Sequence, residues 1–238
     1  MISGLYNLLI YQPLYNGLIF LIDIIPWSDA GMAVILLTLF VKLILFPFSR
    51  KATLTQQKMK QSEPEIRKIK EQYQKNRQEQ AKKMFDLYRE KGINPFSSFF
   101  LILIQLPIII ALYRIFWGSD LPQIDESLLY SFITVPQNVN MVFLGLVDIA
   151  LKSWPLAILV GLSTFFQMKL SMPVSAPKPA APGQSFKDDL ARSMSVQMRY
   201  FFPFVALFIS YSLSGAVALY WLTSNLFAIA QELILKRR

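Results

Sequence analysis

The stretch LLTLFVKLILFPFSRK, residues 36–51, decides the fold class, because it is an apolar run that encloses one lysine and ends in two basic residues. A helix that crosses a membrane needs about 20 mainly apolar residues, and the run extends far enough back from Arg50 to supply them. Lys42 lies inside this run, where a charge costs roughly 2.5–3.5 kcal/mol on insertion scales. Charges in such positions usually face a bundle interior or a water-filled cavity. The stretch therefore predicts a membrane helix with a functional lysine.

The composition of the whole chain indicates the same class. Of its 238 residues, 54% are hydrophobic, and the mean hydropathy is +0.40, with long apolar blocks between charged stretches. These values are typical of a membrane protein with several spans. The absence of cysteine and histidine excludes disulfides, thiolate or imidazole metal sites and histidine-based catalysis. Nothing else in the sequence suggests a metal or an organic cofactor, and we expect no enzymatic activity. The net charge of +9 is attributed to cytoplasmic Lys and Arg rather than to DNA binding.

Five apolar blocks predict an all-α membrane protein with five transmembrane helices. The five blocks are 29–48, 96–117, 154–170, 200–213 and 216–235. Residues 1–28 are also apolar, but Pro13, Gly17 and Asp23 interrupt them. We therefore expect an N-terminal amphipathic helix that lies in the outer interface, rather than a sixth span.

Residues 49–95 differ sharply, because they hold 13 of the 24 basic residues and six acidic ones. Their apolar residues recur every three or four positions, which predicts helices. Ser62 and Glu65 have the spacing of a capping box, Asn76 lies at a polar break, and Gly92 is a helix stop signal. The segment is too long for an ordinary connection. It is predicted to be a helical hairpin outside the membrane.

Charge decides the orientation. Residues 118–153 form an outer loop with four acids and one lysine. Residues 171–199 form a Pro-rich loop, and residues 236–238 form a basic tail. With five spans, the hairpin, the Pro-rich loop and the tail share one side, and its excess of Lys and Arg makes that side cytoplasmic. The N-terminus is then outside and the C-terminus inside. Trp27, Trp117 and Trp154 all fall at the outer boundary, as in an interfacial aromatic belt.

Lys42 would lie about 12 Å from Arg50 along a straight helix, so its side chain cannot fully reach the cytoplasmic surface. We expect it to have no acidic partner in the membrane, which disfavours a proton relay. A hydrated cavity that is open to the cytoplasm and accepts a negative group fits better. Polar residues of other spans could line this cavity, although each alone is more often a link between helices. These residues are Gln105, Gln167, Thr223, Ser224 and Asn225. The short fourth span suggests a locally thinned bilayer.

Four stretches resemble the YidC/Oxa1/Alb3 family of membrane protein insertases. They are PLYNGLIFLIDIIP, GMAVILLTLFVKLILFPFSRKATLTQQKMK, LYREKGINPFSSFFLILIQLPIIIALYRIF and SGAVALYWLTSNLFAIAQELILKRR. With the order of five spans and one hairpin, the resemblance covers nearly the whole chain. It points to the short bacterial form, without a large periplasmic domain or a lipidated cysteine, and thus to the bacterial plasma (inner) membrane.

The resemblance implies an insertase or chaperone that receives hydrophobic segments of nascent membrane proteins in a positively charged groove. The groove opens to the cytoplasm and the lipid, and segments leave it sideways into the bilayer without nucleotide hydrolysis. The sequence has no G-x-x-x-x-G-K-[ST] loop. In the family the basic groove residue is usually Arg. Lys42, at the matching position of this chain, keeps the charge but loses the bidentate hydrogen bonding of the Arg guanidinium. Gln167 and Trp221 fall where the family has polar and aromatic groove residues, although Trp221 also fits the aromatic belt.

The resemblance also implies partners for the hairpin, namely the ribosome, the signal recognition machinery and the Sec translocon. The candidate contacts are Arg67, Lys68, Lys82 and Lys83. The basic tail could touch ribosomal RNA, but three charges after a span also serve as a topology signal. Two other functions stay open. A small solute transporter or channel usually shows an inverted repeat, which the halves of this chain lack. A folding chaperone that holds helices without inserting them is not separable from an insertase by sequence.

Overall fold

The computed structural model describes residues 2–25, 29–94, 96–117, 121, 123–171 and 200–236, and it is mostly helical. The N-terminal helix consists of α1 (Ile2–Tyr6), the π-helical turn η1 (Asn7–Tyr11) and α2 (Gln12–Ile24). The other helices are α3 (Ala30–Ile44), α4 (Phe46–Gln61), α5 (Glu63–Gln72), α6 (Arg77–Glu90), α7 (Ser97–Trp117), α8 (Trp154–Ser171), Tyr200–Ser212 and α10 (Gly215–Lys236). The predictions that fall on Trp27, on 172–199 and on the last two residues lie outside the described residues.

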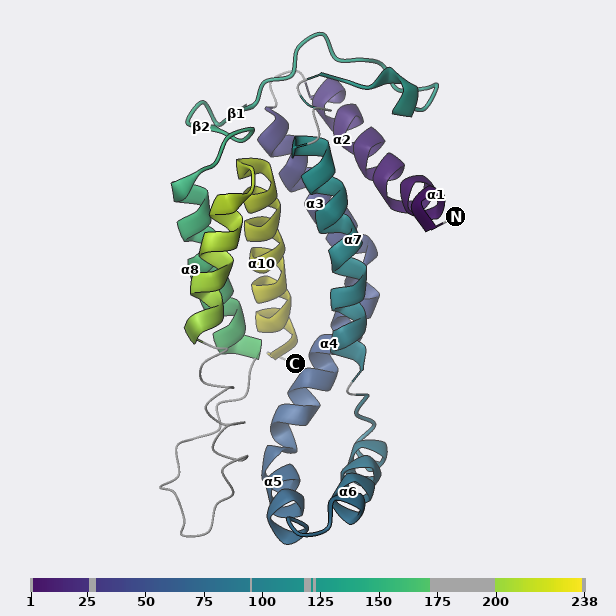
Figure 1. Ribbon diagram of the computed structural model, residues 1–238, viewed down its shortest axis with the longest axis vertical. Coiled ribbons are helices and arrows are strands. Elements are labelled where there is room, and N and C mark those ends of the chain that lie inside the picture. The colour runs from purple at the N-terminus through teal and green to yellow at the C-terminus, as the bar shows by residue number, and fades with distance from the viewer. Residues whose placement is uncertain are drawn as a thin grey trace.

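Figure 1 shows an elongated molecule in which α3, α7, α8, Tyr200–Ser212 and α10 form a bundle. At one end α4, α5 and α6 project from the bundle, and at the other end α2 and the segment from 123 to 151 lie across it. We call these the hairpin end and the loop end. Helix α10 is central, since it contacts α8, α3, α7 and α4. Large apolar side chains such as Phe40, Ile158 and Phe208 are exposed on the bundle surface, which suits contact with lipid.

Within the described residues, two helices are long and apolar enough to cross a membrane by themselves, Gly4–Ile24 and α10. Helices α3 and α4 pass the same test together, as one span bent by 68°. Leu103–Phe116 and Tyr200–Ser212 are shorter apolar helices. These lengths agree with a membrane protein, whereas the arrangement of five spans stays a prediction. The same holds for the interfacial position of 1–28, because Gly4–Ile24 is long enough to span.

The segment predicted as the first span, 29–48, is not one straight helix. Helix α3 ends at Ile44, and α4 begins at Phe46 with Pro47 in its first turn. Proline has no N–H to donate to the preceding turn and its ring crowds that turn, which accounts for the break. Lys42 therefore lies in the last turn of α3, beside the bend. Because of this bend, Lys42 lies closer to Arg50 along the axis of α3 than it would in a straight helix.

The charged segment forms a helical hairpin in which α5 packs against α6, as the sequence predicts. The side chain of Asn76 accepts a hydrogen bond from the Glu79 N–H at 3.2 Å and so begins α6, and Gly92 has a φ of +60° just after α6 ends. The capping-box prediction is wrong, because Ser62 makes no side-chain cap. Glu65 instead accepts a hydrogen bond from Lys91 Nζ at 3.0 Å, which links α5 to the end of α6 and raises the pKa of Lys91.

The loop end carries a small β-hairpin that the sequence does not predict, with β1 (Val142–Phe143) antiparallel to β2 (Val147–Asp148). Asp29 fixes this β-hairpin to α3. One carboxylate oxygen of Asp29 accepts a hydrogen bond from the Met32 N–H and the other from the Leu144 N–H, each at 2.8 Å. The Met32 N–H in the first turn of α3 thus gains a capping partner, and the β-hairpin gains a fixed position.

The rest of the loop is attached to the N-terminal helix. Asn16, which is buried on α2, donates to the carbonyl of Leu128 at 2.8 Å and accepts from the Tyr130 N–H at 2.7 Å. The hydroxyl of Tyr15 accepts a hydrogen bond from the Asp125 N–H at 2.8 Å, at the 3-10 turn η2 (Glu126–Leu128). These bonds hold the described part of the loop against the bundle.

Candidate functional site

Three helices of the bundle each contribute one polar side chain to a chain of hydrogen bonds. Lys42 on α3 donates from Nζ to Oε1 of Gln105 on α7 at 3.2 Å. Gln105 in turn donates from Nε2 to the hydroxyl of Tyr220 on α10. Lys42 and Gln105 are half-buried, while Tyr220 is only 2% exposed. The structure therefore brings together two of the predicted site residues and adds Tyr220, which sequence reasoning missed because a tyrosine in an apolar helix resembles ordinary core.

The partner of Lys42 is a neutral amide. Among the described residues, Lys42 forms no ion pair. The predicted fifth span does contain one acid, Glu232, but that carboxylate is engaged elsewhere. It accepts a hydrogen bond from Ser171 at 2.5 Å and pairs with Lys236 at 3.2 Å. The positive charge of Lys42 is thus held in place without being neutralised by a carboxylate of the described chain.

Asn225 connects two helices. It is 4% exposed on α10, and its Nδ2 donates to the hydroxyl oxygens of Ser163 at 3.0 Å and Thr164 at 2.9 Å on α8. Interhelical hydrogen bonds of this kind stabilise membrane bundles. No hydrogen bond joins Asn225 to Lys42 in the part of the chain that the structure describes. Its position favours a structural role in the α8–α10 pair.

Asn225→Ala is expected to lower the free energy of unfolding by about 1 kcal/mol, because two buried hydroxyl oxygens lose their donor. Thermal unfolding of the detergent-solubilised protein measures this change. Leu226→Ala is the matched control, since Leu226 is the next residue of α10 and is exposed. Equal melting temperatures for the two variants would contradict the role assigned to Asn225.

The other two predicted groove residues make no hydrogen bond to Lys42 among the described residues. Gln167 is half-buried on α8, and Trp221 is partly buried and packs against the core next to Tyr220. Thr223 and Ser224 are buried, and the hydroxyl of Thr223 donates to the Leu219 carbonyl of its own helix. A groove lined by all of these residues stays a prediction.

A second polar cluster joins α4 to α10 at the hairpin end. Gln231 is 6% exposed; its Oε1 accepts a hydrogen bond from Ser49 at 2.9 Å, and its Nε2 donates to Thr53 at 3.2 Å. These bonds attach the first two turns of α4 to α10 and help to set the direction of the helical hairpin. Sequence reasoning missed Gln231, although an adjacent Gln–Glu pair near the end of an apolar helix was a signal.

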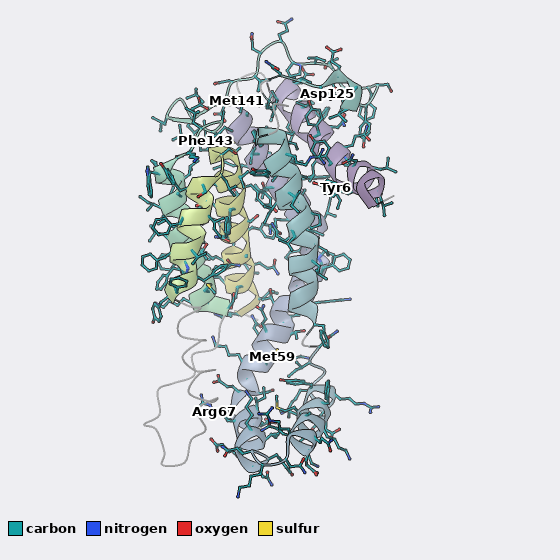
Figure 2. The ribbon with its side chains drawn as sticks, in the orientation of Figure 1. Tyr6, Met59, Arg67, Asp125, Met141 and Phe143 are labelled. Carbon is teal, nitrogen blue, oxygen red and sulfur yellow. The ribbon has the colours of Figure 1, made fainter. Side chains whose placement is uncertain are left out.

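The four predicted contacts of the hairpin lie on α5 and α6. Arg67 donates to Glu63 at 2.9 Å within α5, so part of its charge is compensated locally. Lys68, Lys82 and Lys83 are exposed. Figure 2 shows Arg67 at the hairpin end, far from Asp125 and Phe143 at the loop end. The hairpin thus presents cationic side chains well away from the β-hairpin.

Known proteins resemble this chain over nearly all of its length. The family model described as "60Kd inner membrane protein" matches residues 21–238. Proteins named "Membrane protein insertase YidC" from Francisella tularensis subsp. novicida (strain U112) and subsp. holarctica (strain LVS) are each 33% identical to it over 234 residues. The alignments cover 94% of this chain and 37% of each relative, so the chain spans well under half the length of these curated relatives.

Proposed function

Because this chain belongs to the 60Kd inner membrane protein family, the family of the YidC, Oxa1 and Alb3 insertases, we propose that it inserts nascent membrane proteins into the bilayer. It receives their hydrophobic segments in a positively charged groove and releases them into lipid without nucleotide hydrolysis. The observation that carries this proposal is the half-buried Lys42, which has an amide partner and no carboxylate partner among the described residues.

The first step is electrostatic. An ammonium group has three N–H donors, and Gln105 accepts only one of them at 3.2 Å. Two unit charges 4 Å apart attract each other by about 4 kcal/mol at an effective dielectric constant of 20. An acidic residue in the translocated segment of a substrate can therefore pair with the remaining N–H donors of Lys42. That attraction offsets part of the cost of bringing a carboxylate into the membrane.

The second step uses the apolar surface next to Lys42. On α3 the residues that flank it, Phe40, Leu43 and Ile44, are exposed, and so are Leu103 and Leu106 on α7 near Gln105. A substrate helix that meets the polar cluster at one end can lie against this surface and pass into lipid. The juxtaposition of a charged group and an apolar, lipid-facing wall supports lateral release.

The proposed topology has five spans in the bacterial inner membrane, with the N-terminus outside and the C-terminus in the cytoplasm. The domain bounds are those predicted from the sequence, with 1–28 in the outer interface and 49–95 as the cytoplasmic hairpin. This orientation places α5 and α6 where a ribosome, the signal recognition machinery or the Sec translocon can reach Lys68, Lys82 and Lys83. Exposed lysines suit the anionic surface of such partners.

Purified protein in vesicles is expected to insert single-span and double-span substrates without ATP, since the proposed mechanism uses only charge attraction and partitioning. Protease protection of the translocated segment measures insertion, with protein-free vesicles as the control. Ion or solute flux through the same vesicles tests the transporter or channel alternative. Flux without insertion would refute the proposed function.

A further inference from the structure

The tip of the β-hairpin is apolar and exposed, which is unusual for a loop beyond the end of a bundle. Leu146 is 82% exposed and Leu144 is 59% exposed. The six residues 142–147, VFLGLV, include no charged or polar side chain. Loops in water are normally built from polar residues, and protruding apolar side chains that cluster together mark a contact with another apolar phase or partner.

The backbone of this turn keeps a leucine where leucine is disfavoured. Leu144 has a φ of +51° and Gly145 has a φ of +71°, and the Leu146 N–H donates to the Phe143 carbonyl at 3.0 Å. Turns with positive φ at both central positions usually carry Asn, Asp or Gly there. A bulky residue at positive φ is an outlier, and such outliers concentrate at positions with a function.

The base of the β-hairpin is held firmly, so the direction of the tip is fixed. The ring of Phe143 packs directly on Gly31 of α3, where an added Cβ would lie 2.5 Å from the nearest ring atom. The Asp29 carboxylate accepts a hydrogen bond from the Leu144 N–H, and the Ile149 N–H donates to the Met141 carbonyl at 2.9 Å. Figure 2 shows Met141 and Phe143 together at the loop end of the bundle. Phe143 is thus the inward anchor, while the two leucines point away from the core.

An apolar stripe runs along α8, the helix that follows the β-hairpin in the chain. Leu151 is exposed just before this helix, and every fourth residue along one face of α8 is about half exposed, namely Trp154, Ile158, Leu162 and Phe166. In a membrane protein this face contacts lipid. Trp154 stacks on Tyr211 at the loop end of the stripe, and aromatic residues of these types gather at the membrane interface. Lys152, beside Leu151, is exposed and suits the anionic lipid phosphates.

We propose that Leu144 and Leu146 insert into the bilayer leaflet at the loop end, so that the β-hairpin is a lipid anchor. Three observations favour lipid as the occupant: the exposed apolar side chains of Leu151 and α8 that follow the β-hairpin, the charge-free tip and the exposed Lys152 in the same loop. The anchor would hold the loop against the membrane. Two carbonyls of this loop, those of Ile149 and Leu151, accept hydrogen bonds from the first N–H groups of α10. This role is separate from insertion of substrates, and it stands whether or not the chain is an insertase.

The absence of cysteine allows a clean test with single-cysteine variants of the full chain. Leu146→Cys is labelled with the polarity-sensitive fluorophore NBD and reconstituted in vesicles of phosphatidylcholine and phosphatidylglycerol. We expect its emission to shift to the blue on reconstitution and to be lost when lipids spin-labelled near the headgroup are included. Leu151→Cys is a second reporter should Leu146→Cys fold poorly. Leu162→Cys is the lipid-facing control, and Gln137→Cys, exposed in the same loop, is the aqueous control.

The outcomes separate the possible occupants. Strong quenching of the Leu146 and Leu151 probes by lipid-borne spin labels, with weak quenching by aqueous iodide, supports the lipid anchor. Quenching by iodide equal to that at Gln137, without lipid quenching, overturns it in favour of an exposed loop. Shielding from both quenchers that increases with the ratio of protein to lipid also overturns it, because a second copy of the chain then covers the tip.

Discussion

Lys42→Glu is expected to reduce insertion of substrates with acidic translocated segments by roughly tenfold or more, which corresponds to about 1.4 kcal/mol. The charge at the Gln105–Tyr220 cluster reverses, so an attraction for a substrate carboxylate becomes a repulsion of similar size. Lys42→Ala removes the attraction without adding repulsion and should fall between the wild type and Lys42→Glu. Insertion into vesicles is measured for two substrates that differ only in having acidic or neutral translocated segments.

The comparison of substrates separates a charge effect from a folding defect. Both variants are expected to insert the neutral substrate nearly as well as the wild type, and Lys42→Arg is expected to retain insertion of both. Gln105→Leu removes the amide partner of Lys42 while leaving its charge, so it should affect the two substrates alike. If Lys42→Glu inserted the acidic substrate as well as the wild type, charge attraction at Lys42 would be refuted.

Helical extents were readable from the sequence because long apolar blocks and charged stretches alternate so clearly. Helices α8 and α10 begin and end within one residue of the predicted blocks 154–170 and 216–235. The break at Leu45 was missed, although Pro47 was visible, because the surrounding residues stay apolar on both sides of it. The β-hairpin was missed for a related reason, since Leu144 occupies the turn position where Asn or Gly is expected.

The candidate site was predictable only in part. Lys42 and Gln105 are conspicuous because each lies inside an apolar block. Their pairing, however, depends on how α3 and α7 pack against α10, and the spacing of apolar residues does not predict that packing. Tyr220 accepts the hydrogen bond from Gln105 only because α10 is central in the bundle. Gln231 likewise acquires its role from the nearness of Ser49 and Thr53 on the bent helix α4. Sequence thus identifies which polar groups are costly, and tertiary packing decides which of them meet.

Gly215→Val is expected to have the largest effect on stability, because the backbone of the loop packs directly on this first residue of α10. A Cβ at Gly215 would lie 2.9 Å from Cα of Ile149 and 3.2 Å from the carbonyl oxygen of Leu151. Those neighbours are backbone atoms, which cannot turn aside as a side chain can. The substitution also displaces two hydrogen bonds, from the Gly215 N–H to Leu151 at 2.8 Å and from the Ala216 N–H to Ile149 at 2.9 Å.

Overpacking costs about 1–3 kcal/mol and each lost hydrogen bond about 0.5–1.5 kcal/mol, so Gly215→Val should lower the free energy of unfolding by roughly 3 kcal/mol. Thermal unfolding in detergent measures the loss, and faster proteolysis within the loop locates it. Gly4→Val is the matched control, because a Cβ at Gly4 meets nothing within 4 Å. Valine is also the better helix former of the two residues, so the control should be neutral or slightly stabilising. Equal stability of both variants would mean that the loop does not close the start of α10 as the structure has it.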